Sequence, residues 1–290
     1  MKKNALNALI LMSTLWACTS AKKENQDANA YNQAEQSLEN QIKDVVYNIP
    51  PPSEVPYMLQ AAGADFNKAL IADSKNADKY LSLTEKAALN LGVYATDIGY
   101  LSSYEKTQEA INYISVCKKL AESLGIAGSF SASDMKRFEG SIANKDSLTS
   151  ILNASIVKSD KFLRDDNRST LAALILTGSF AEGLYISTGL IKSYPKNLLP
   201  ADQRNQILAP LVDAIRSQAK TVNEFIAMLN ALSDKAVDPI PAILQELEAL
   251  KASYAAFGPR NPEKLTDVLT DKNLLEISAI AERLKKTITE

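Results

Sequence analysis

Apolar residues recur every three or four positions along most of this chain, and no stretch keeps a strict alternation of apolar and polar residues. The first pattern is typical of amphipathic helices, whereas the second would have indicated strands. The sequence therefore predicts an all-α fold, a compact bundle of nine or ten helices. The expected helices cover residues 57–73, 81–101, 102–125, 131–143, 146–166, 168–193, 202–232, 238–258 and 262–289, the last with a break near Asp271.

The pattern changes at the N-terminus, which divides the chain into three parts. Lys2 and Lys3 precede an apolar run over residues 5–15, which is too short to span a bilayer and is typical of a secretion signal. Residues 18–48 are mostly polar and predict a tether. The expected organisation is a signal peptide over 1–17, a tether over 18–48 and a single all-α domain over 49–290.

The end of the apolar run carries a specific motif. Residues 15–18, Leu-Trp-Ala-Cys, resemble the cleavage box of bacterial lipoproteins. This resemblance implies that Cys18 is acylated, with palmitate among the attached chains, and that the protein is held to a membrane of the cell envelope by its N-terminal lipid. Thr19, rather than Asp, follows the cysteine, and this resembles the pattern of lipoproteins sorted to the outer membrane. A plain signal peptide with an incidental cysteine is the alternative.

Composition removes several classes of function. The chain contains no histidine among its 290 residues, so Ser-His-Asp and Cys-His catalysis are excluded, as are metal sites built on imidazole. We expect no cofactor and no metal. The net charge is −2 without a basic block, so we expect no nucleic-acid partner. Cys117 has no expected disulfide partner and is predicted to be a buried structural thiol.

Residues 171–191 form an apolar run of 21 residues with a single charge, Glu182. This length permits a membrane span, but the central acid and several Ser and Thr residues argue against one. A helix that is apolar on all sides is also typical of the centre of a bundle. We therefore expect a buried central helix.

Five of the ten glycines lie inside two predicted helices, although each costs about 1 kcal/mol relative to alanine there. Such repeated cost predicts either close approach of two helix backbones or space beside them for a ligand. The five residues are Gly92, Gly99, Gly178, Gly183 and Gly189.

The same two helices carry Asp97 and Glu182 in mostly apolar surroundings. A buried carboxylate needs hydrogen-bond donors, a cation or a raised pKa. The hydroxyls of Tyr94, Tyr100 and Tyr185 are potential donors, and Arg137, Arg164 and Arg168 are potential charge partners. Three interpretations remain open, namely a structural network, a pocket for a polar or cationic ligand, and a catalytic pair. The candidate ligand-binding residues are Tyr94, Asp97, Tyr100, Arg168, Glu182 and Tyr185, and the candidate catalytic residues are Asp97 and Glu182.

Three phrases resemble patterns in uncharacterised helical lipoproteins of Bacteroidota-type bacteria: residues 49–54 (IPPPSE), 90–97 (NLGVYATD) and 178–185 (GSFAEGLY). The resemblance implies an envelope lipoprotein with an all-α body and carries no known activity. Two functional hypotheses follow. The first is a non-enzymatic binding or scaffold module for an unidentified envelope protein or small ligand. The second is a glycosidase-like hydrolase that uses Asp97 and Glu182.

Overall fold

Helices make up the regular structure of the part of the chain that the computed structural model describes. This part comprises residues 33, 35–45, 54–127, 136–137, 140, 168–232, 236–257 and 267–290, and it contains no strand. The all-α class is therefore confirmed. Cys18, Arg164 and nearly all of the two helices expected over 131–143 and 146–166 lie outside the described residues.

The main helices follow one another along the chain. They are α2 (Glu54–Ala61), α3 (Thr84–Ser103), α4 (Thr107–Ser123), α7 (Ser169–Lys192), α8 (Ala201–Ser217), α9 (Ala219–Asn230), α10 (Ile240–Phe257) and α11 (Lys272–Thr289). Short 3-10 segments are η1 (Lys68–Leu70), η2 (Ser74–Tyr80) and η4 (Val268–Thr270).

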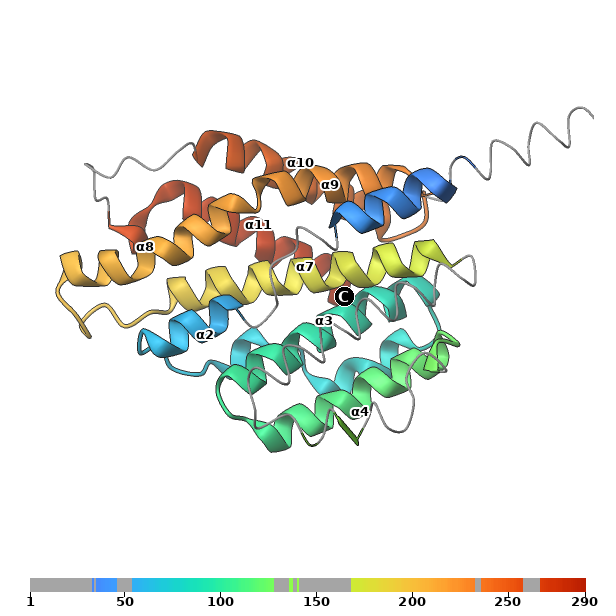
Figure 1. The fold of residues 1–290 in the computed structure, drawn as a ribbon, viewed down its shortest axis with the longest axis horizontal. Helices are drawn as coiled ribbons and strands as arrows, with labels where there is room; N and C mark the ends of the chain where they lie inside the picture. Colours follow the sequence, from blue (N-terminus) through green and yellow to red (C-terminus); the bar gives the residue numbers. More distant parts are fainter. Residues whose placement is uncertain are drawn as a thin grey trace, which may run out of the picture.

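Helix α7 forms the centre of the bundle, as its apolar composition predicts. It runs between α3 and α4 on one side and α9, α10 and α11 on the other (Figure 1). Among the described residues it is the one helix long and apolar enough to cross a membrane, but most of it is buried inside the protein. Because neighbouring helices cover its faces, the apolar composition is explained by the core.

Helices α3 and α7 approach each other at two glycines. A Cβ atom on Gly92 would lie 2.0 Å from the carbonyl oxygen of Ile175, and one on Gly178 would lie 1.9 Å from that of Leu89. Real Cβ atoms do not approach backbone oxygens so closely, so only glycine permits this contact. Close packing is thus the explanation for these two residues.

The helix expected over residues 57–73 is much shorter. Helix α2 ends at Ala61, and Gly63 follows in the left-handed conformation with a φ of 87°. The side chains of Asn67 and Asp73 then cap short 3-10 segments by accepting from the amides of Ala69 and Lys75. Residues 62–83, which we call the strap, therefore cross the bundle without forming an α-helix. These local side-chain bonds compete with helix formation, which periodicity alone does not reveal.

Two further boundaries differ from expectation. Residues 35–45 are helical and bury Leu38, Ile42 and Val45, so the packed body begins inside the segment predicted as a polar tether over 18–48. Three apolar residues at helical spacing supply the face that anchors this helix. The helix expected over 202–232 is divided at Gln218 into α8 and α9. The predicted break at Asp271 is confirmed, since its side chain caps α11.

Candidate functional site: a buried acid pair with a lysine

The α3–α7 contact brings Asp97 and Glu182 into the same region of the core. Contacts advance along both helices in the same direction, from Gly92 beside Ile175 to Thr96, whose hydroxyl lies 2.8 Å from that of Ser179. Asp97 and Glu182 come next along each helix, and neither has any exposed surface. The two acids that stand out in the sequence therefore belong to one cluster.

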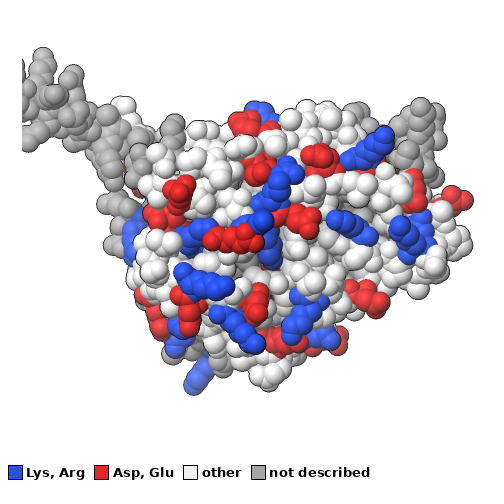
Figure 2. All heavy atoms as spheres, turned by 180° about the vertical axis from the view of Figure 1, so that it is seen from behind, with Lys and Arg blue, Asp and Glu red and all other residues white. Residues whose placement is uncertain are grey.

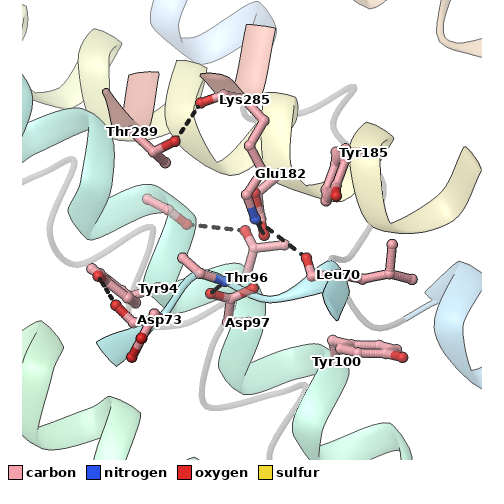
Figure 3. Close-up of polar contacts among 12 residues, drawn as sticks. Leu70, Asp73, Tyr94, Thr96, Asp97, Tyr100, Glu182, Tyr185, Lys285 and Thr289 are labelled. Atoms are coloured by element: carbon pink, nitrogen blue, oxygen red, sulfur yellow. Dashed lines mark hydrogen bonds and ion pairs between the residues drawn. The ribbon is translucent and has the colours of Figure 1, made fainter. Parts of the chain in front are cut away.

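Lys285 of α11 supplies the cation. Its ammonium group forms an ion pair and hydrogen bond with Glu182 Oε1 and donates to the strap carbonyl of Leu70 at 3.2 Å (Figure 3). Its side chain is only 13% exposed. Burial alone would lower the pKa of Lys285, but the charges of Glu182 and Asp97 raise it above its ordinary value, so the lysine is protonated. We call Asp97, Glu182 and Lys285 the acid–lysine cluster.

Asp97 is bound to the strap. Its Oδ2 atom accepts a hydrogen bond from the amide of Ala72 at 3.1 Å. Burial first, and then the charge of Glu182, raise the pKa of Asp97 well above its ordinary value. Asp97 Oδ1 and Glu182 Oε2 are both buried, and neither accepts a hydrogen bond from an N–H group of the residues described.

The tyrosines do not donate to the acids, contrary to expectation. The Tyr94 hydroxyl donates to the carbonyl of Asp73 at 2.9 Å, and the Tyr100 hydroxyl accepts from the amide of Asn67 at 2.8 Å. Tyr185 places its ring 4.7 Å from the Lys285 ammonium, within cation–π range. Tyr94 and Tyr100 therefore hold the strap, while Tyr185 contacts the cation of the cluster.

The prediction that Arg168 is a charge partner of the acids is wrong. It lies at the start of α7 and donates to the carbonyls of Leu124 and Gly125 at the end of α4. Fourteen residues of helix separate it from Glu182, which is about 20 Å at 1.5 Å per residue. Arg137 is exposed. Lys285, from the far end of the sequence, takes the role expected of an arginine.

A signal for Lys285 is present in the sequence. Leu274, Ser278, Ala281 and Ile288 are buried and lie on one stripe of α11, and Lys285 occupies the same stripe at the usual spacing of three or four residues. A lysine in an apolar stripe needs a partner. Which acid it meets depends on the packing of α11 against α7.

Tyr113, on α4, is a further residue that the sequence did not single out. Its hydroxyl donates to the carbonyl of Ala72 at 2.6 Å, directly beside the amide that binds Asp97. Ala72 is thus held through both of its backbone polar groups. The hydrogen bonds of the site therefore fix the strap over α3 and α7.

We expect Tyr113→Phe to lower the free energy of unfolding by about 1–2 kcal/mol, since it leaves the buried Ala72 carbonyl without this donor. Tyr254→Phe is the matched control, because the Tyr254 hydroxyl is buried and has no hydrogen-bond partner among the described residues. Removing that hydroxyl should leave stability unchanged or raise it. Urea unfolding of both variants measures the difference, and equal effects would contradict the proposed role of Tyr113.

Cys117 is a free cysteine and packs against the core while remaining partly buried. Burial, and after it the charge of Asp97, raise the pKa of its thiol. A raised pKa keeps the group a thiol, which is a poor nucleophile. The described residues contain no group of three or more Asp, Glu, Cys or His side chains placed to hold a metal ion.

No family model matches the chain, and the searches of curated proteins and of solved structures find no match either.

Proposed function

We propose that this protein is a lipid-anchored binding or scaffold module of the bacterial cell envelope that acts without catalysis. The observation that carries the proposal is the complete burial of Asp97 and Glu182, whose hydrogen bond and ion pair connect elements of the fold. The strongest candidates for chemistry are thereby engaged in holding the bundle together. The N-terminal motif that ends at Cys18 supports the envelope location, and Thr19 after it supports an outer-membrane anchor.

The hydrolase hypothesis finds no support in this geometry. A glycosidase places the scissile bond between two carboxyl groups, so substrate must reach both of them. Asp97 and Glu182 have no exposed surface, and the strap is hydrogen-bonded to Asp97 and to Lys285, the partner of Glu182. We therefore assign no catalytic role to either acid.

We expect no nucleic-acid partner, and the charges on one face of the protein are in line with this expectation. On the face shown in Figure 2, basic and acidic side chains are interspersed and no continuous basic area is seen. Nucleic-acid binding draws most of its affinity from clustered positive charge. The net charge of −2 is in line with this interpretation.

The anchor is tested by metabolic labelling with a fatty-acid analogue. We expect the wild-type protein to be labelled and Cys18→Ala to lose the label completely, because the thiol is the acceptor. Cys117→Ala is the matched control and should keep the label, since Cys117 lies in the folded body. Equal labelling of wild type and Cys18→Ala would contradict the lipid anchor.

The binding role is tested by capture from native membranes, with mass spectrometry of the proteins and small molecules that elute. A binding module should retain its partner in unchanged chemical form during prolonged incubation. Time-dependent appearance of a product that wild type makes and Glu182→Gln does not would contradict the proposal and favour the hydrolase.

A further inference from the structure

The acid–lysine cluster contains an unbalanced charge. Two carboxylates and one ammonium group would leave a net negative charge among residues with little or no exposed surface. An uncompensated charge in a protein interior is very costly, so such groups neutralise where they can. A single added proton would make the cluster neutral.

The hydrogen bonds of the four carboxylate oxygens also indicate one added proton. Asp97 Oδ2 is occupied by the amide of Ala72, and Glu182 Oε1 by the ammonium of Lys285. The two oxygens left over, Asp97 Oδ1 and Glu182 Oε2, are both acceptors without a donor among the described residues. Two ionised carboxylates cannot bond to each other, whereas a protonated one donates readily to an ionised one. One proton between these oxygens would give each of the four its partner.

We propose that Asp97 and Glu182 form a buried proton-binding site. Asp97 carries the proton at neutral pH and donates it in a hydrogen bond to Glu182, which pairs with Lys285. The contacts decide which acid holds the proton, because the lysine stabilises a charge on Glu182 and no comparable cation contacts Asp97 among the residues described.

The surrounding groups favour the same assignment. Burial and the charge of Glu182 raise the pKa of Asp97, and they outweigh the lowering by the charge of Lys285 and by the hydrogen bond from the Ala72 amide. Several ionisable side chains lie close enough to Asp97 to interact with its charge. They are Tyr94 and Tyr100 of α3, Tyr113 and Cys117 of α4, Tyr185 of α7 and Lys285 of α11. Two further acids lie beside these groups, since Asp73 of the strap interacts with Tyr94 and Tyr113, and Glu282 of α11 interacts with Tyr185.

The proton couples the site to the strap. Ala72 and Leu70 belong to the strap and contact Asp97 and Lys285 respectively. When the proton leaves, two adjacent carboxylates share one lysine, and their repulsion acts between α3 and α7 beneath the strap (Figure 3). Proton loss therefore weakens the closed arrangement of strap and helices.

Infrared spectroscopy of the full chain tests the site directly. The wild-type protein should show the carbonyl band of a protonated carboxylic acid at neutral pH, and Asp97→Asn should lose it. Glu276→Gln, which removes an exposed acid of α11, is the matched control and should keep the band. Absence of the band from wild type, or its persistence in Asp97→Asn, would overturn the proposal.

Stability as a function of pH supplies a second measurement. Because the pKa of Asp97 is raised in the folded state, the folded protein binds a proton at pH values where the unfolded chain has released it. The contribution of Asp97 to stability is therefore complete below the pKa of the unfolded aspartate and is lost as the pH rises through the pKa of the folded state. Asp97→Asn should remove this decline, because its amide imitates the protonated acid. An identical pH profile in wild type and Asp97→Asn would overturn the assignment.

Discussion

Replacing Gly178 with alanine should lower the free energy of unfolding by about 3 kcal/mol or more. The added Cβ would lie 1.9 Å from the backbone carbonyl oxygen of Leu89, and a backbone atom cannot rotate away as a side chain can. The helices would have to separate, which costs more than the roughly 1 kcal/mol that alanine gains in helix propensity. Urea or thermal unfolding, followed by circular dichroism, measures the loss.

Gly183→Ala is the matched control on the same helix. A Cβ there would meet only the Thr96 methyl group at 4.0 Å, an ordinary van der Waals contact. We expect this variant to be as stable as the wild type or more stable by up to about 1 kcal/mol. If Gly178→Ala and Gly183→Ala had the same free energy of unfolding, this result would contradict the close contact of α3 with α7.

Replacing Lys285 with methionine should cost about 3–5 kcal/mol at neutral pH. Methionine fills similar space but leaves the fully buried Glu182 without its cation, and removal of one partner of a buried ion pair is strongly destabilising. Denaturant unfolding at neutral pH measures the loss.

The neighbouring residue supplies the control for this variant. Lys286 forms an ion pair with Glu290 at 3.6 Å, but both side chains are more than two-thirds exposed. Surface pairs contribute little, so Lys286→Met should change stability by less than about 1 kcal/mol. A Lys285→Met protein as stable as Lys286→Met would show that the acid–lysine cluster does not support the fold.

Much of the fold is predictable because it depends on local patterns. The spacing of apolar residues predicts α3, α4, α7 and α10 near their observed positions, since a helix must present an apolar face to the core. Gly92 and Gly178 indicate either close helix packing or space for a ligand, because glycine is costly inside a helix, and the structure decides for close packing. The strap is not predictable in this way, because tertiary contacts, rather than helical periodicity, bury its apolar residues 70–72.

The candidate site is also predictable only in part from the sequence. Asp97 and Glu182 are recognisable because an acid in an apolar stripe demands compensation. Their partners are not, because Lys285 is more than 100 residues from Glu182 in the sequence and meets it only when α11 packs against α7. Helix spacing places the tyrosines near the acids, whereas Tyr94 and Tyr100 bond to a strap whose path depends on the whole bundle.

The sequence by itself determined the helical class of this protein, the positions of most of its helices and the two acids that require an explanation. Each of these follows from the identity and spacing of residues within one or two helical turns. Only the tertiary structure decided that the two acids share one cluster, that a distant lysine compensates one of them and that the strap bonds to Asp97 and to that lysine. Those outcomes depend on contacts between segments far apart in the chain, and the free energy of a buried charge depends on every group that packs around it.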